Sequence, residues 1–136
     1  MIRHTTVGTQ NIAAAKQFYD AVLAPLNLVA RYDADYAVGY GKPDAPNHQC
    51  VFWSMLPING DAASFGNGTS IAFWANSQAQ VDAVYRAAIE QGAKCEGAPG
   101  PRKDYHPDIY VAYFRDPDQN KLAVIFDANH PPVTAS

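Results

Sequence analysis

The sequence predicts an α+β fold in which two tandem βαβββ modules form a cupped mixed sheet with helices on its outer faces. Three observations support this fold class. Two segments place apolar residues at helical spacing. Several short runs are rich in β-branched and aromatic residues, as strands are. The two halves of the chain also match in pattern when the second is laid over the first.

The first module is expected to begin with a strand near 3–9, followed by a helix over 11–24. Apolar side chains recur on one face of this helix. Asn11 is of the residue type that caps a helix N-terminus, and Pro25 ends the helical pattern. Two further strands are expected, near 35–41 and 49–56.

The second module repeats this plan with a strand near 69–75 and a helix over 78–91. Ser77 and Gln80 have the spacing of a capping box, and Gly92 stands where a C-terminal glycine belongs. A loop rich in proline, glycine and basic residues is expected between Gly97 and Pro107. The last two strands, near 109–115 and 120–127, are joined by the turn sequence Asp116-Pro117-Asp118-Gln119 and form a hairpin.

The internal repeat defines the domain organisation. A shift of 66 aligns Ser70 with His4 and Tyr85 with Tyr19. Each module alone is too small to bury its own sheet, so the two must pack together. We expect one domain over 1–128, with modules at about 1–66 and 67–128, and a loose C-terminal tail over 129–136.

Composition excludes several classes of protein. The 136 residues carry a net charge of −3, and the basic residues are dispersed, which argues against a nucleic-acid partner. No apolar run approaches the roughly 18 residues that a membrane span needs. Cys50 and Cys95 lack a pairing motif, so we expect a reducing, cytoplasmic location.

Strand alternation divides the side chains between the helix-facing and concave sides of the sheet. In the first strand, Thr5 and Val7 suit the helix side, which leaves His4 and Thr6 for the concave side. For the strand near 49–56 two assignments are open: the concavity is faced either by the set of Trp53 (Val51, Trp53 and Met55) or by the set of Phe52 (Phe52, Ser54 and Leu56). In the second module the concave set is Ser70, Ala72, Trp74, Lys121, Ala123 and Ile125.

Several strings together resemble one family. His4-Thr5-Thr6-Val7 and the segment 15–23 are similar to its opening strand and helix, and the segment 114–122 is similar to its closing hairpin. The family is the vicinal oxygen chelate superfamily, which includes glyoxalase I, extradiol dioxygenases and bleomycin-resistance proteins. The segment 101–110 resembles a loop of an uncharacterised, glyoxalase-like branch.

The resemblance implies a divalent metal site, of which this chain keeps one ligand. Family enzymes use two His and one or two Glu on inward-facing strands. The corresponding positions are His4, Ser70, Trp53 and Ala123, and only His4 supplies a usual ligand. The chain contains just two glutamates, Glu90 and Glu96, at or just beyond the second helix. We therefore predict no metal and no other cofactor.

The candidate site residues have structural alternatives. His4 and His106 are the candidate acid-base catalysts, although each can equally be a half-buried or loop residue held by the backbone. Aromatic candidates can stack on a ligand or simply fill the core. The ligand-binding candidates are Trp53, Ser70, Trp74, Tyr105, Tyr110, Arg102 and Ala123.

The sequence leaves three functions open. The favoured one is metal-free binding of a small apolar or aromatic compound in the concavity. The resemblance implies that the binding protein is a homodimer, because family relatives of one domain commonly complete their sites across a two-fold interface. The resemblance also allows a metal-dependent lyase, isomerase or dioxygenase that holds zinc, nickel, manganese or iron with unorthodox ligands. The third possibility is a scaffold dimer that has lost its site.

Overall fold

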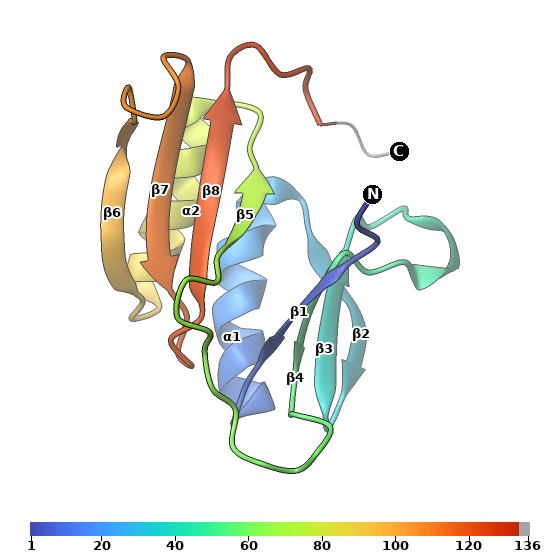
Figure 1. The fold of residues 1–136 in the computed structure, drawn as a ribbon. Coiled ribbons are helices and arrows are strands. Elements are labelled where there is room, and N and C mark those ends of the chain that lie inside the picture. Colours follow the sequence, from blue (N-terminus) through green and yellow to red (C-terminus); the bar gives the residue numbers. More distant parts are fainter. Residues whose placement is uncertain (134–136) are drawn as a thin grey trace.

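The described residues of the computed structural model, 1–133, form two four-stranded sheets, each with one α-helix packed against it (Figure 1). This confirms the predicted α+β fold of two βαβββ modules. The first module contains β1 (Thr5–Gly8), α1 (Ile12–Leu23), the 3₁₀ helix η1 (Ala24–Leu26), β2 (Val29–Ala34), β3 (Ala37–Gly41), the 3₁₀ helix η2 (Pro46–His48) and β4 (Phe52–Met55). The second contains β5 (Ile71–Trp74), α2 (Gln78–Glu90), β6 (Lys94–Pro101), β7 (Ile109–Arg115) and β8 (Lys121–Asp127).

The two sheets have equivalent topologies. Their strand orders are β1-β4-β3-β2 and β5-β8-β7-β6, and in each the first strand pairs in parallel with the last. All other pairs are antiparallel. Figure 1 shows β1 and β5 at the centre of the molecule, with α2 behind β7 and β8 and with α1 between the two sets of strands.

The number of residues that separates equivalent elements of the two modules is constant through the first half of each module and then increases. Thr5 and Ile71 begin β1 and β5, and Ile12 and Gln78 begin the two α-helices at the same offset. The third strands, β3 and β7, begin at Ala37 and Ile109, which lie further apart along the chain than the earlier pairs. From its first strand to its last, the second module spans more residues than the first, because its β6 strand and the loop that follows are extended.

Two strands differ from the sequence-based expectation. Neither β2 nor β6 was predicted, and β6 extends to Pro101 through a segment that we expected to be a loop from Gly97. β6 is an edge strand, which tolerates proline because its outer backbone groups face solvent. Its pairing with β7 shifts register on both sides of Gly97. These irregularities hide the alternation that marks a strand.

The predicted helix boundaries are confirmed by their caps. The side chain of Asn11 accepts a hydrogen bond from the Ala14 N–H at 3.0 Å. Ser77 Oγ accepts one from the Gln80 N–H at 3.1 Å. Gly92 takes the left-handed conformation, with φ of +88°, that ends α2.

The core lies between the helices and the inner faces of the two sheets. Its largest buried side chains come from both modules. None of the helices within residues 1–133 is long and apolar enough to cross a membrane. The fully buried members include Phe18, Tyr19, Val22, Leu23, Val38, Tyr40, Phe52, Val81, Val84, Phe114, Leu122 and Val124.

A buried carboxylate joins the two modules. Asp116, in the turn between β7 and β8, is 1% exposed and accepts a 2.5 Å hydrogen bond from the Tyr19 hydroxyl of α1. It also accepts hydrogen bonds from the backbone N–H groups of Asp118 and Asn120, both at 2.9 Å. The Asn120 amide in turn donates to the Gly8 carbonyl of β1 at 2.9 Å. We call this set of contacts the Asp116 network.

The beginning of the C-terminal tail is held on the second module. The side chain of Asn76 donates to the Val133 carbonyl at 3.0 Å and accepts the Val133 N–H at 2.7 Å. The His130 ring stacks on Trp74 with 3.9 Å between centroids. The part of the tail that we expected to be loose is thus fastened as far as Val133, and residues 134–136 lie outside the described part of the chain.

The Asp116 network predicts that Tyr19→Phe destabilises the protein by about 1.5–3 kcal/mol, because a buried carboxylate loses a hydrogen-bond donor. Urea unfolding should show a lower midpoint with an unchanged slope. Tyr40→Phe is the matched control. Its hydroxyl donates to the more exposed Asp20 at 2.8 Å, and we expect a loss of about 0.5–1.5 kcal/mol.

The effect of Tyr19→Phe should also depend on pH. Burial raises the pKa of Asp116, while the hydrogen bond from Tyr19 opposes that rise. Because the folded-state pKa is the higher one, this group's stabilising contribution is lost as pH rises through it. Removing the phenol raises the folded-state pKa further, so the cost should be larger at pH 7 than at pH 4. A difference in unfolding free energy that is constant across this range would contradict this role.

Candidate functional site

The structure decides which face of β4 lines the concavity. Phe52 is buried in the core, whereas Trp53 pairs with Thr6 of β1 and lies on the concave side. The set of Trp53 is therefore the concave one. In β1, β5 and β8, the predicted division of side chains between the helix-facing and concave sides is also confirmed. Val7, Phe73 and Leu122 pack into the core from the helix side.

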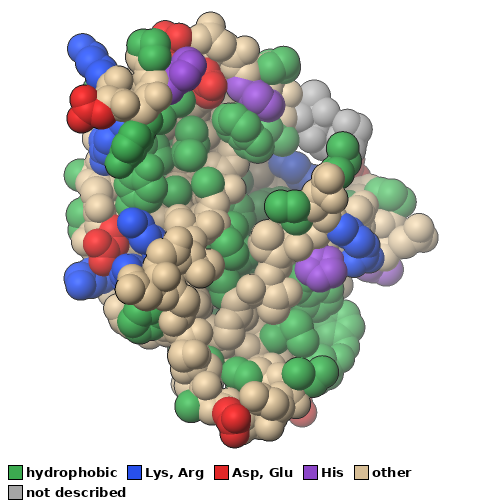
Figure 2. Space-filling model, viewed as in Figure 1, with side chains coloured by type: hydrophobic (Ala, Val, Ile, Leu, Met, Phe, Trp, Pro, Cys, Tyr) green, Lys and Arg blue, Asp and Glu red, His purple; other side chains and the backbone are tan. Residues whose placement is uncertain are grey.

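The concave side of the first sheet contains a cavity of about 340 Å³, which we call the aromatic hollow. Tyr32 and Trp53 lie with their ring centroids 5.3 Å apart, and the Tyr32 and Tyr36 hydroxyls are hydrogen-bonded to each other. This hydrogen bond raises the pKa of Tyr32. Figure 2 shows hydrophobic side chains gathered over the first sheet, at the lower right. The residues that line the hollow are Arg3, His4, Thr6, Tyr32, Tyr36, Ala37, Trp53 and Met55.

Gly39 makes room for the indole of Trp53 over the sheet. In the strand pairing, Gly39 of β3 lies between Tyr32 of β2 and Trp53 of β4. A Cβ atom at this position would lie 2.8 Å from the Cε3 and Cζ3 atoms of Trp53, which is closer than such atoms approach. The absence of a side chain therefore lets the two aromatic rings lie side by side.

His4 uses one of its two ring nitrogens in a hydrogen bond with Arg3. Its Nδ1 is 2.9 Å from Arg3 Nη1. A guanidinium can only donate, so Nδ1 is the acceptor and a neutral His4 carries its proton on Nε2. The His4 ring meets Trp53 edge-on, with 6.5 Å between centroids. At this edge, the hollow thus offers hydrogen-bond donors from His4 and Arg3 beside an aromatic surface.

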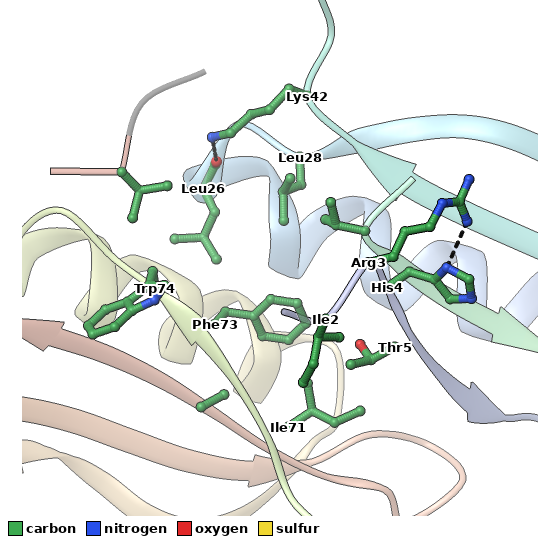
Figure 3. A pocket seen from close by; sticks show the side chains of 13 residues that line it. Ile2, Arg3, His4, Thr5, Leu26, Leu28, Lys42, Ile71, Phe73 and Trp74 are labelled. Atoms are coloured by element: carbon green, nitrogen blue, oxygen red, sulfur yellow. Dashed lines mark hydrogen bonds between the residues drawn. The ribbon is translucent and has the colours of Figure 1, made fainter. Parts of the chain in front are cut away.

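Trp74 lines a different cavity. This second cavity, of about 510 Å³, lies between the start of β1 and β5 and reaches η1, and we call it the inter-module cleft. Figure 3 shows Trp74 and Phe73 on one side of it and Lys42, Leu26 and Leu28 on the other. His4 and Arg3 line both cavities.

The positions that correspond to family metal ligands do not form a metal site. Ala72 pairs with Ala123 as Thr6 pairs with Trp53, so Trp53 and Ala123 occupy equivalent places in the two modules. His4 and Ser70 likewise stand just before β1 and β5. Among these four side chains, imidazole is the one usual metal ligand. Within residues 1–133, no three His, Cys, Asp or Glu residues lie close enough to hold an ion.

The other predicted site residues lie outside the aromatic hollow. Tyr110 points to the helix side, where its hydroxyl donates to Asp82 of α2 at 2.7 Å, and this raises the pKa of Tyr110. Ala123 is 1% exposed, and Ser70 is exposed at the start of β5.

The candidates from the loop after β6 also lie away from the hollow. Arg102 donates to the Ala98 carbonyl at 2.8 Å and lies over the ring of Tyr113. Tyr105 is 73% exposed, and His106 Nδ1 accepts the backbone N–H of Asp108 at 3.3 Å. Of the predicted ligand-binding residues, Trp53 lines the hollow and Trp74 the cleft.

Sequence reasoning missed Arg3, Tyr32 and Tyr36. Tyr32 lies on β2, which was not predicted, and Tyr36 lies in the turn between β2 and β3. The internal repeat contained the necessary signal, because residues 29–34 align with 95–100 of β6. Recognising either strand would have indicated the other.

A model of the Glyoxalase/Bleomycin resistance protein/Dioxygenase superfamily matches residues 1–124. The chain belongs to this superfamily. The match agrees with the two βαβββ modules and with the equivalent positions of Trp53 and Ala123. No curated protein sequence matches the chain.

Solved structures of the superfamily are similar over almost the whole chain. A glyoxalase/bleomycin resistance protein from Albidiferax ferrireducens T118 is 35% identical, with 93% of this chain and 98% of that chain covered and a TM-score of 0.83. A glyoxalase-related enzyme from Fulvimarina pelagi is 15% identical, with 100% and 94% covered and a TM-score of 0.77. A superfamily member from Burkholderia phytofirmans PsJN is 17% identical, with 92% and 97% covered and a TM-score of 0.66.

The donor set predicts that zinc, nickel, manganese and iron(II) do not bind stoichiometrically at micromolar concentration. Metal content of the untagged protein, measured by mass spectrometry before and after equilibration with each ion, tests this expectation. His4→Ala is the control, because adventitious surface binding should not change when this imidazole is removed. One equivalent of metal that disappears in His4→Ala would restore the metalloenzyme interpretation.

Proposed function

We propose that this superfamily member binds a small planar aromatic compound in the aromatic hollow and does so without a metal. The observation that carries the proposal is the exposed aromatic surface on the concave side of the first sheet. Tyr32 is 39% exposed and Tyr36 is 50% exposed, although both border a cavity. Partly exposed rings around a concave space are typical of sites for flat apolar ligands.

The polar edge of the hollow supports a ligand with an oxygen acceptor. His4 Nε2–H and the Arg3 guanidinium are both donors, and Arg3 adds a positive charge. An aromatic carboxylate satisfies both features, with its ring against Trp53 and its carboxylate at this edge. His4 is also the one predicted acid-base residue that lines the hollow, so it is our candidate for proton transfer to a bound compound.

The competing functions have less support. A metal-dependent lyase, isomerase or dioxygenase needs ligands that Trp53, Ser70 and Ala123 do not supply. A scaffold that has lost its site has no need of an open aromatic hollow. We retain the homodimer in the proposal, because a second copy against the open side would enclose the exposed rings. We also retain a reducing, cytoplasmic location, which the free thiols of Cys50 and Cys95 support.

The proposal predicts that Trp53→Ala weakens binding of an aromatic carboxylate at least tenfold, since a stacking partner and its apolar area are lost. The probe is 2-naphthoate, titrated by calorimetry, with the uncharged 2-naphthalenemethanol as a test of the contribution of Arg3. Circular dichroism and thermal unfolding establish that the variant is folded.

Trp74→Phe is the matched control, because the chain has two tryptophans and Trp74 lines the other cavity. It should bind 2-naphthoate as the unmodified protein does. Equal affinity in a folded Trp53→Ala protein would refute binding in the aromatic hollow. A second test is Gly39→Ala, which should displace the indole and also weaken binding.

A further inference from the structure

We propose that the inter-module cleft is a second binding site, for an aliphatic carboxylate of medium chain length. The cleft has about 510 Å³, within the range of cavities that hold small organic ligands. Leu26 and Leu28 form its floor and are 6% and 8% exposed. This site does not depend on the function proposed for the aromatic hollow.

The lining of the cleft favours an alkyl chain over a flat ring. Most of its apolar side chains are branched and aliphatic: Ile2, Leu26, Leu28, Val51, Ile71 and Val133. Trp74 is the large aromatic at its mouth, but His130 already stacks on this indole, with an interplanar angle of 20°. One face of Trp74 is thus occupied, and its remaining surface adds to an aliphatic wall.

The charges around the cleft favour an anion. The titratable side chains among its described lining residues are Arg3, His4 and Lys42, and none of the lining residues is Asp or Glu. Figure 3 shows Arg3 directed toward His4 and away from Phe73 and Trp74, whereas Lys42 reaches Leu26 on the floor of the cleft. Lys42 is therefore the cation placed to meet a headgroup.

Lys42 is fixed in a position that leaves it able to bind a carboxylate. Its Nζ donates one hydrogen bond, of 3.1 Å, to the Leu26 carbonyl. An ammonium group has three N–H donors, so two can point toward a ligand. A carboxylate at Lys42 would leave the alkyl chain to run over Leu28 toward Phe73.

The mouth of the cleft is apolar and is bordered by the tail. Ile2, Val51 and Trp74 are 79%, 42% and 45% exposed, an unusual amount of apolar surface to leave beside a cavity. Val133 lines the same cavity and is held by its paired hydrogen bonds with Asn76. The tail thus supplies one wall, and a bound alkyl chain would cover the exposed side chains.

The test uses decanoate below its critical micelle concentration and the full chain with Trp53→Phe, which leaves Trp74 as the sole tryptophan. Trp74 emission should shift to the blue and saturate as decanoate is added. The reciprocal Trp74→Phe protein, which reports Trp53, should not respond. A response from Trp53 alone would overturn the assignment to the cleft, and so would the absence of any binding.

Charge variants at the cleft separate headgroup recognition from simple apolar binding. Lys42→Gln should weaken decanoate binding about tenfold and leave decanol binding unchanged. Val51→Asp, at an exposed position of the mouth, should weaken decanoate binding at least as much, while the matched Val51→Asn should have little effect. Equal affinity for decanoate and decyltrimethylammonium would refute recognition of an anion.

The remaining outcome concerns a second copy of the chain as the occupant. If Trp74 emission shifts to the blue with protein concentration alone, in step with dimer formation measured by light scattering, the partner copy covers the cleft and the proposal fails. This result does not decide the proposal for the hollow, which is tested by calorimetry with 2-naphthoate and the Trp53→Ala variant. The two proposals can therefore fail independently.

Discussion

The placement of the two modules relative to each other depends on the buried Asp116 network. A carboxylate in the turn between β7 and β8 receives the Tyr19 hydroxyl of α1, and the neighbouring Asn120 amide reaches the Gly8 carbonyl of β1. These contacts connect the last hairpin of the second module with the first helix and first strand of the chain. They fix the two sheets relative to each other, and with them the edges between which the cleft opens.

The repeat made the fold predictable, and the irregular strands limited the prediction. One constant offset relates β1 to β5 and α1 to α2, because both modules share the same local pattern. β2 and β6 were not recognised as strands, because edge strands show less alternation of apolar and polar side chains. Gly97 and the prolines of β6 also break the usual strand composition.

The candidate site was predicted only where side chains belong to regular strands. Strand alternation placed His4 on the concave side, and the register of β4 decided the side of Trp53. Tyr110 is one of the ligand-binding candidates, and sequence reasoning could not foresee its hydrogen bond with Asp82 of α2. Tyr32 reaches the hollow through the β2–β3 pairing, a contact that depends on Gly39.

The outer edges of the two sheets have a consequence for behaviour at high concentration. β2 and β6 end their sheets, so their outer backbone groups are open to strands of other molecules. Both strands contain a register shift, and β6 also contains proline, which cannot donate a backbone hydrogen bond. The two irregular edges therefore act as built-in protection against edge-to-edge aggregation, and the same features that hid these strands from prediction help to keep separate molecules apart.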